Sequence, residues 1–258
     1  MKEYGQGEKI GVAVIQPALV EEGDARRLAR VERLLYGARG ADLVLLPELW
    51  RVGYSDFSSY SRKAETLEGE TVSFLRKVTR GLGIYLLGGS IVERQGERLY
   101  NTAALLDREG KLIGSYRKAH LLSYRSQERD LLTPGGGSEV VKTKIGRLGI
   151  AICYDLRFPE LFRGMSEQGA EVFLIPAAWP SARMEAWEAL CQARAVENQG
   201  YIIACNAVGR GLLGRSMVVD PWGVKVAALG VREGVLQAEI DLEALRDFRD
   251  EFSAWRER

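Results

Sequence analysis

The sequence predicts a layered α/β sandwich built around one core. Short apolar runs alternate with segments of helical periodicity along the chain, and some runs come in pairs that are separated only by a turn. This alternation is typical of helices that pack on the faces of sheets. No internal repeat, low-complexity block or linker divides the 258 residues, so we expect a single domain over residues 1–258.

The amino-terminal half predicts five strands and two helices. The first two strands are short apolar runs that end at Pro17 and Pro47, and the turn sequence REGK joins the last two strands. In both helices apolar residues recur at helical spacing among charged ones. The expected strands cover 10–15, 43–46, 85–92, 100–107 and 112–117, and the expected helices cover 28–38 and about 70–82.

The carboxy-terminal half continues the alternation after a long irregular segment. Residues 123–139 are polar and rich in glycine, which predicts a loop. Loops of this length in compact domains are usually functional or disordered. The strands expected after it cover 148–152, 172–175, 201–205, 216–219, 225–228 and 235–240, and the helices lie near 161–165 and 187–195.

Composition excludes several classes of function. The chain has 36 Lys and Arg against 35 Asp and Glu, a balance that argues against nucleic-acid and membrane-surface partners. The terminus MKEYGQGEK lacks the apolar run of a signal peptide, and no uncharged stretch approaches a membrane span. Three cysteines without a CxxC pair favour neither disulfides nor zinc. We expect a soluble cytoplasmic protein, because free thiols suit a reducing compartment.

Cys153 is the most informative candidate for chemistry. It lies in LGIAICYDLRFPE at residues 148–160, where an apolar strand turns abruptly into a helix. Such a corner lifts a side chain clear of the sheet and aims the first backbone N–H groups of the helix at whatever that side chain attacks. We therefore expect the Cys153 thiol to be a nucleophile and the N–H of Tyr154 to complete an oxyanion hole.

A thiol nucleophile needs a base or a nearby cation, because little of it is ionised at neutral pH. Glu48 follows an apolar strand and a proline, where burial can raise its pKa toward neutrality. Lys118 ends a strand and could lower the thiol pKa and stabilise an oxyanion. Singly, each is more often a solvated surface residue. Together with Cys153 they predict acyl transfer in which Glu48 takes the thiol proton and returns it to a leaving amine.

Three segments of the chain resemble the signatures of the nitrilase, or carbon–nitrogen hydrolase, superfamily. They occur in the family's order, and the likeness runs from about residue 10 to residue 240. The three segments are LLPE at 45–48, YRKAHL at 116–121 and ICYDLRFPE at 152–160.

This resemblance implies a four-layer α-β-β-α sandwich, no metal or organic cofactor, and frequent homodimers. It also implies a catalytic triad of Glu48, Lys118 and Cys153. The family has a second glutamate in the loop after the lysine strand, and Glu128 matches that position. Asp130, two residues further on, is the alternative.

Several other residues are expected to have structural rather than catalytic roles. His120 is the single histidine, and we expect it to be structural because Glu48 already supplies a base. Cys191 and Cys205 are expected to be small core residues. The sequence GRGLLG at 209–214 fits the GxGxxG dinucleotide pattern, but a strand rather than a helix follows it. Without a helix N-terminus nothing there receives a pyrophosphate, so we expect a strand-connecting loop.

Within the superfamily, AAWPSAR at 177–183 looks most like the omega-amidases, which deamidate short dicarboxylic monoamides such as 2-oxoglutaramate. The family more often has Asn or Gln where Ala178 stands. Arg157, four residues after the nucleophile, could clamp a distal carboxylate bidentately or pair with an acidic neighbour, Asp155 or Glu160. Trp179 could pack over a short acyl chain or fill the core.

The expected function is a cofactor-independent thiol amidase that converts a small carboxylate-bearing amide to acid and ammonia through a Cys153 thioester. Hydrolysis of a nitrile, an N-carbamoyl amino acid or deaminated glutathione stays open, because pocket size depends on loops such as 123–139. A non-catalytic interaction module that keeps the fold is the alternative from another class. Intact Glu48 and Lys118 beside the cysteine favour the enzyme.

Overall fold

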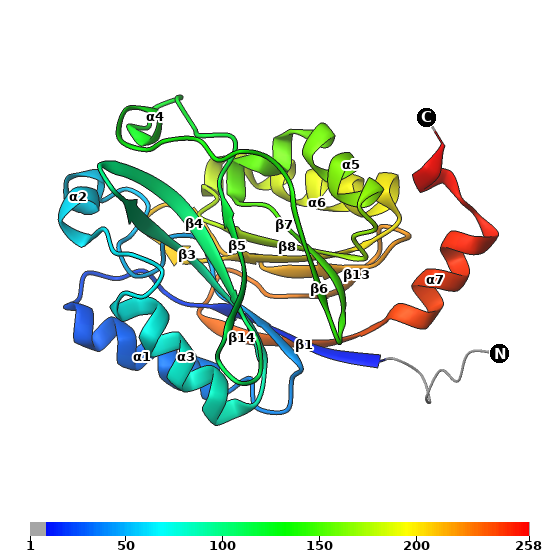
Figure 1. Cartoon of the computed structure of the whole chain (residues 1–258), viewed down its shortest axis with the longest axis horizontal. Helices are drawn as coiled ribbons and strands as arrows, with labels where there is room; N and C mark the ends of the chain where they lie inside the picture. The colour runs from blue at the N-terminus through cyan, green and yellow to red at the C-terminus, as the bar shows by residue number, and fades with distance from the viewer. Residues whose placement is uncertain (1–8, 258) are drawn as a thin grey trace.

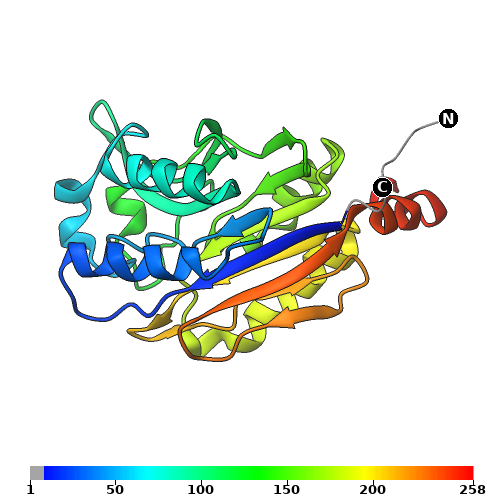
Figure 2. The ribbon, with the colours of Figure 1, turned by 90° about the horizontal axis from the view of Figure 1, so that it is seen from below.

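Two six-stranded sheets face each other in this computed structural model, which describes residues 9–257. Helices cover the outer face of each sheet, so the expected four-layer α-β-β-α sandwich is confirmed (Figures 1 and 2). Residues 1–8, which carry most of the expectation that no signal peptide is present, lie outside the described residues. No helix among those described is long and apolar enough to cross a membrane.

The first sheet combines the amino-terminal strands with the last strand of the chain, in the order β14-β1-β2-β3-β4-β5. β1, β2 and β3 run parallel, and the other neighbours are antiparallel. Helices α1 (Asp24–Tyr36) and α3 (Glu70–Leu82) pack on its outer face. The strands are β1 Lys9–Gln16, β2 Leu43–Leu45, β3 Tyr85–Gln95, β4 Arg98–Leu106, β5 Leu112–Arg117 and β14 Gly234–Asp241.

The second sheet has the order β13-β12-β9-β8-β7-β6, with β7, β8 and β9 parallel. Helices α5 (Pro159–Glu167) and α6 (Met184–Asn198) cover it. Its strands are β6 Glu139–Thr143, β7 Gly146–Ile150, β8 Val172–Ala177, β9 Tyr201–Asn206, β12 Met217–Val219 and β13 Lys225–Ala228. The short elements are α2 Tyr60–Lys63, α4 Glu128–Leu131, β10 Val208–Gly209, β11 Leu212–Leu213 and the 3₁₀ turns 57–59, 153–157, 181–183 and 254–256.

The alternation of side chains along β1 divides the core into two parts. Val12 and Val14 belong to the apolar cluster between the sheets, whereas Ala13 and Ile15 belong to the cluster under α1 and α3. Successive side chains of a strand point to opposite faces, so one apolar run serves both layers. This explains why the run reads as continuously apolar in the sequence.

Several features differ from the sequence-based expectations. The expected loop 123–139 contains the helical turn α4, and β6 begins at its last residue. The sequence predicted neither β6 nor α7 (Leu242–Glu251), which projects at one end of the molecule (Figure 1). Asp241 is the N-cap of α7, and its side chain accepts a hydrogen bond from the Ala244 N–H at 2.9 Å.

Two glycines allow their backbone to lie very close to the carbonyl groups of neighbouring segments. At Gly89, where φ is +69°, a Cβ atom would lie 2.0 Å from the carbonyl oxygen of Pro47. At Gly135 a Cβ would lie 2.0 Å from the carbonyl oxygen of Arg117. Only glycine permits these contacts, which press the chain against the segments that precede Glu48 and Lys118.

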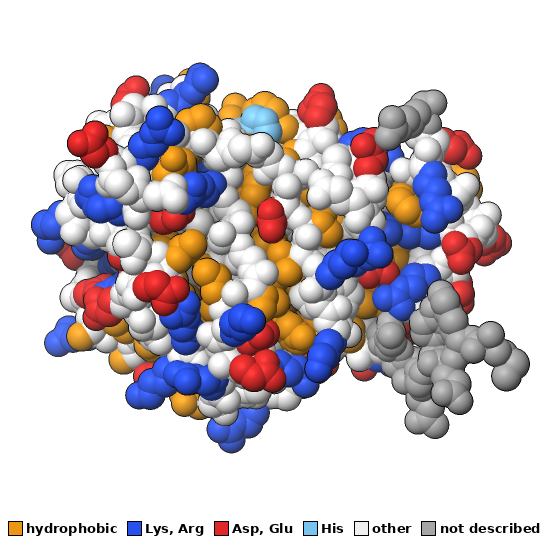
Figure 3. All heavy atoms as spheres, viewed as in Figure 1, with side chains coloured by type: hydrophobic (Ala, Val, Ile, Leu, Met, Phe, Trp, Pro, Cys, Tyr) orange, Lys and Arg blue, Asp and Glu red, His pale blue; other side chains and the backbone are white. Residues whose placement is uncertain are grey.

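The near balance of charge in the sequence is visible on the surface. On the face drawn in Figure 3, basic and acidic side chains are interspersed.

Candidate active site

The corner expected at Cys153 is present between β7 and the 3₁₀ turn Cys153–Arg157. Cys153 has φ of 49°, a left-handed conformation that is strained for a residue with a side chain. Asp155 holds the corner, because its carboxylate accepts hydrogen bonds from the Ile152 N–H and the Tyr116 hydroxyl, both at 2.9 Å. A 3₁₀ turn, rather than the expected helix, follows the cysteine directly, and α5 begins at Pro159.

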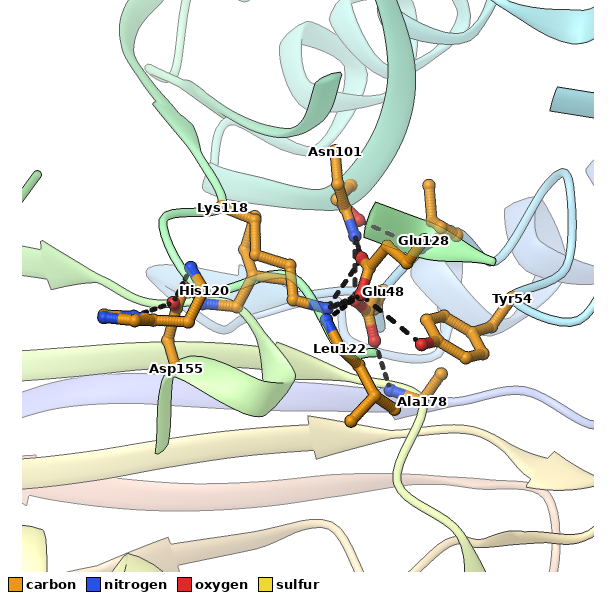
Figure 4. Close-up of polar contacts among 12 residues, drawn as sticks. Glu48, Tyr54, Asn101, Lys118, His120, Leu122, Glu128, Asp155 and Ala178 are labelled. Atoms are coloured by element: carbon orange, nitrogen blue, oxygen red, sulfur yellow. Dashed lines mark hydrogen bonds and ion pairs between the residues drawn. The ribbon is translucent and has the colours of Figure 1, made fainter. Parts of the chain in front are cut away.

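His120 belongs to this support and not to the thiol. Its backbone N–H donates to Asp155 Oδ1 at 2.9 Å, and its Nδ1 lies 2.8 Å from the same oxygen (Figure 4). Its ring stacks on Phe158 with centroids 3.6 Å apart. This geometry agrees with the structural role expected for the single histidine.

Glu48 lies just beyond β2 with its carboxylate fully buried. Its Oε1 accepts hydrogen bonds from Lys118 Nζ and Asn101 Nδ2, both at 2.8 Å (Figure 4). Its Oε2 accepts the Ala178 N–H at 2.9 Å. The Cys153 thiol lies close enough to this carboxylate for Glu48 to raise the thiol pKa. The structure therefore brings the three residues of the expected triad together.

Lys118 lies between two carboxylates. Its Nζ is 2.8 Å from Glu48 Oε1 and 2.8 Å from Glu128 Oε1, and the three side chains have no solvent exposure. Glu128 stands on α4, and its Oε2 also accepts the Leu122 N–H at 2.9 Å. Asp130 is exposed on the same turn. The geometry thus selects Glu128 over Asp130 as the second carboxylate.

Burial and charge shift the pKa values in this cluster. Burial raises the pKa of Glu48, although the positive charge of Lys118 opposes it. Burial alone would lower the pKa of Lys118, but the negative charges of Glu48 and Glu128 outweigh it and raise that pKa well above its usual value. The ammonium is therefore a fixed positive charge.

Lys118 lowers the pKa of the Cys153 thiol, as expected, but its effect does not decide the net shift. Burial and the negative charge of Glu48 raise the pKa of Cys153 well above its usual value and outweigh the opposing effect of Lys118. The resting thiol is consequently protonated. A protonated thiol needs a base before it can attack at neutral pH, and Glu48 is the buried carboxylate beside it.

The sequence-based search missed Asn101 and the Ala178 N–H. Asn101 Nδ2 donates to Glu48 Oε1 at 2.8 Å and to Glu128 Oε1 at 3.1 Å. The pairing of Thr102 with Arg117 in β4 and β5 places Asn101 beside Lys118. Asn101 is the one amide in β4, which has few other polar residues, and that was the available signal.

A cavity of about 450 Å³ opens above Cys153. Its wall contains aromatic rings and five cationic side chains, and no Asp or Glu stands among the described residues that line it. The lining residues include Lys118, Tyr124, Arg125, Cys153, Tyr154, Arg157, Trp179, Arg183 and Arg210.

A model of the carbon-nitrogen hydrolase family matches residues 11–250. The chain belongs to this family. A 2-oxoglutaramate amidase of Bacillus subtilis (strain 168) is 36% identical over 217 residues, which are 83% of each chain. A deaminated glutathione amidase of Mus musculus is 37% identical over 237 residues, which are 85% of this chain and 73% of the relative.

The fold agrees with this assignment. The crystal structure of a nitrilase-superfamily protein from Saccharomyces cerevisiae superposes with a TM-score of 0.87 at 32% identity, covering 95% of this chain and 94% of the other. The protein is thus an enzyme that hydrolyses carbon–nitrogen bonds, and the expectation of a hydrolase is confirmed.

In this carbon-nitrogen hydrolase, Arg157 and Trp179 form one wall of the cavity. The Arg157 guanidinium lies 5.2 Å from the Trp179 ring centroid. Within residues 9–257, Arg157 forms no ion pair with Asp155 or Glu160. Trp179 is buried, and its indole N–H donates to the Arg183 carbonyl at 2.8 Å. Trp179 therefore both fills the core and lines the cavity, while Arg157 lines the cavity and is exposed to solvent.

Three further arginines that the sequence did not single out stand at the same cavity. Arg125 and Arg183 lie 5.3 Å and 5.2 Å from the ring centroid of Tyr124. Arg210 stands in the hairpin between β10 and β11, so GRGLLG is a strand-connecting turn as expected. These residues come from separate loops, and only the fold brings them together.

The hydrolase was also expected to need no metal ion. Over the part of the chain that the structure describes, no group of three or more His, Cys, Asp or Glu is placed to hold a metal ion. That the enzyme works without metal or cofactor stays a prediction.

Proposed function

We propose that this enzyme is an amidase that hydrolyses a small amide bearing a distal carboxylate, with 2-oxoglutaramate as the leading candidate. The observation that carries the proposal is the cavity above Cys153, whose wall has four arginines and no described acidic residue. Guanidinium groups bind carboxylates through paired, charge-assisted hydrogen bonds. The likeness to a 2-oxoglutaramate amidase supports the same substrate.

Acylation begins with Glu48 and Cys153 in contact. Glu48 accepts the thiol proton while the sulfur attacks the amide carbon, and the carbonyl π electrons move to oxygen. The Tyr154 N–H and the ammonium of Lys118 stabilise that oxyanion. The oxyanion then collapses, the carbon–nitrogen bond breaks, and the nitrogen takes the proton from Glu48. Ammonia leaves, and the acyl group remains on Cys153 as a thioester.

Deacylation reverses these roles with water. Glu48 accepts a proton from a water molecule whose oxygen attacks the thioester carbon. The carbon–sulfur bond then breaks, and the departing sulfur takes the proton back from Glu48. The acid is released, and Glu48 and Cys153 return to their starting states. Burial raises the pKa of Glu48, and a carboxyl with a raised pKa both accepts and donates this proton more readily than an exposed glutamate.

The wall made by Arg157 and Trp179 supports recognition of the distal carboxylate. The guanidinium carbon of Arg157 lies 5.2 Å from the Trp179 ring centroid, within the range of a cation–π contact, and such a contact leaves the N–H groups for a ligand. Trp179 would then pack along the short acyl chain between the carboxylate and the scissile carbon.

Deaminated glutathione is a second candidate. It is a larger amide with more than one carboxylate, and the cavity of about 450 Å³ has more arginines than one carboxylate requires. A relative of similar identity carries that activity in its name. The two candidates differ in which arginines they need, since a short substrate reaches only those near Cys153.

Ammonia release from a panel of compounds tests the proposal. The panel contains 2-oxoglutaramate, succinamate, butyramide, a nitrile, an N-carbamoyl amino acid and deaminated glutathione. We expect the acidic amides to be turned over with the highest kcat/KM. Preferential turnover of butyramide or of the nitrile would contradict the proposal, and no turnover of any compound would favour an interaction module.

We further propose that the chain is one domain that forms a homodimer in the cytoplasm. An apolar surface, the Trp222 patch, supports the dimer, and it comprises Trp222, Phe248, Phe252, Val196 and Val224. The rings of Trp222 and Phe248 are tilted against each other with centroids 4.5 Å apart, and Trp222 remains 50% exposed. The three free cysteines suit a reducing compartment. Light scattering on the wild type and on Trp222→Glu tests the dimer, and a monomeric wild type would contradict it.

A further inference from the structure

We propose that Asn101 is a positioning residue that joins Glu48 to Glu128 and orients Glu48 for proton transfer with Cys153. This inference rests on the proposed role of Glu48 as the general base. Asn101 would act through Glu48 and not through contact with the substrate, because it does not line the cavity.

The hydrogen bonds of Asn101 reach both carboxylates. Its Nδ2 lies 2.8 Å from Glu48 Oε1 and 3.1 Å from Glu128 Oε1, so each proton of the amide serves one carboxylate (Figure 4). If the side-chain amide were flipped, its oxygen would face the two carboxylate oxygens, which are also acceptors. Asn101 Oδ1 is buried and has no hydrogen-bond partner within the described residues. An unpaired acceptor is costly, so the donor side of the amide accounts for its place here.

The charge of the cluster explains why an amide suits this position. Lys118 supplies one positive charge to two carboxylates, Glu48 and Glu128. A second cation would neutralise the cluster and weaken Glu48 as a base. A neutral donor holds the two carboxylates together and leaves Glu48 basic.

The contacts of Glu48 also divide between its two oxygens. Oε1 accepts hydrogen bonds from both Lys118 and Asn101. Among the described hydrogen bonds, Oε2 accepts only the one from the Ala178 N–H, at 2.9 Å. Oε2 is therefore the less occupied acceptor for the thiol proton. Asn101 holds the other oxygen and so fixes the rotation of the carboxylate.

The backbone keeps Asn101 in register with Lys118. The Lys118 N–H donates to the Asn101 carbonyl at 2.8 Å. The next residue, Thr102, points to a different partner and donates to Glu93 Oε2 at 2.6 Å. Thr102→Val therefore removes a buried hydrogen bond to a carboxylate from the same strand without touching Glu48, and it is a matched control.

The first test compares Asn101→Leu with Thr102→Val by ammonia release from 2-oxoglutaramate between pH 5 and 9. We expect kcat of Asn101→Leu to fall about 10- to 100-fold at pH 7, as for the loss of hydrogen bonds to charged groups. KM should change by less than about threefold, because substrate contacts are intact. Losing a donor favours the protonated form of Glu48, so the acid limb of kcat should move to higher pH. Thr102→Val should keep the wild-type limb.

Asn101→Asp is the second test and keeps the shape of the side chain. At low pH the new carboxyl is protonated and can donate to one of the two glutamates. At higher pH it ionises and repels both. We expect its activity to be confined to the acid side of the wild-type profile, and circular dichroism should confirm that each variant folds.

A second readout does not depend on the substrate. The rate at which iodoacetamide alkylates Cys153, followed by peptide mass, should shift with pH in Asn101→Leu as kcat does. Unchanged pH profiles of kcat and of alkylation in both Asn101 variants would overturn the inference. Equal losses of kcat in Asn101→Leu and Thr102→Val, without a shift of the acid limb, would also overturn it.

Glu48→Gln is the control that separates this inference from the proposed function. If it retains full activity, the proposed base is wrong, whereas an inactive Glu48→Gln beside normal Asn101 variants refutes only the role of Asn101.

Discussion

Nδ1 of His120 lies 2.8 Å from Oδ1 of Asp155, so the only histidine of the chain supports the corner at Cys153 and leaves Glu48 in contact with the thiol. A Cys–His mechanism and a Cys–Glu mechanism make opposite predictions for variants of these residues.

Glu48→Gln should fold and bind substrate but lose about 10²- to 10⁴-fold in kcat, because an amide cannot accept the thiol proton. His120→Ala should lose less than about tenfold, since it removes one support of the corner. Steady-state ammonia release from both variants is the measurement. An active Glu48→Gln beside an inactive His120→Ala would mean that the base is the histidine.

Activity should fall on the acid side at a higher pH than an exposed glutamate would give. Burial raises the pKa of Glu48, and the base must be ionised to take the thiol proton. As pH decreases through that raised pKa, Glu48 becomes protonated and kcat decreases. A pH profile of kcat measures the midpoint. An acid limb within the usual range of an exposed glutamate would show that Glu48 is solvated or is not the base.

Arg157→Ala should lower kcat/KM for succinamate about 10- to 100-fold, because it removes a charge-assisted pair with the distal carboxylate. Butyramide has no such carboxylate and should be affected much less. Arg157→Lys should rescue only part of the loss, since an ammonium lacks the planar fork of a guanidinium. Arg129→Ala is the matched control, an exposed arginine outside the cavity wall. Equal losses for both amides would make Arg157 structural.

EDTA and added nicotinamide nucleotides should leave the rate unchanged. The proposed steps move protons and electron pairs only among Glu48, Cys153, water and the amide. The measurement is ammonia release before and after dialysis against the chelator. Activity lost in EDTA and restored by a divalent metal would overturn the cofactor-independent mechanism.

The periodicity of the sequence predicted most of the fold because the central strands are continuous apolar runs. The expected helix at about 70–82 corresponds to α3, Glu70–Leu82. β6 was missed because only Val141 among its five residues is buried. α7 was missed because its charged residues outnumber the few that are buried, such as Leu242 and Leu245.

The sequence predicted a site residue only where that residue lies within a recognisable local motif. Glu48, Lys118 and Cys153 each stand close to the end of a strand, and the three motifs named them. The cavity arginines Arg125, Arg183 and Arg210 come from loops whose convergence no local pattern encodes. The raised pKa of the Cys153 thiol results from burial and two opposing charges, and only the geometry decides their balance.

Trapping the acyl enzyme tests the central claim most directly. Wild-type enzyme quenched in acid during turnover of 2-oxoglutaramate, then analysed by intact mass and peptide mapping, should carry the acyl group as a thioester on Cys153. Cys153→Ala should carry no adduct and have no turnover, whereas Cys191→Ala should behave as wild type, because Cys191 is buried in α6 away from the cavity. An acyl adduct on Cys191 or Cys205, or turnover by Cys153→Ala, would contradict the account.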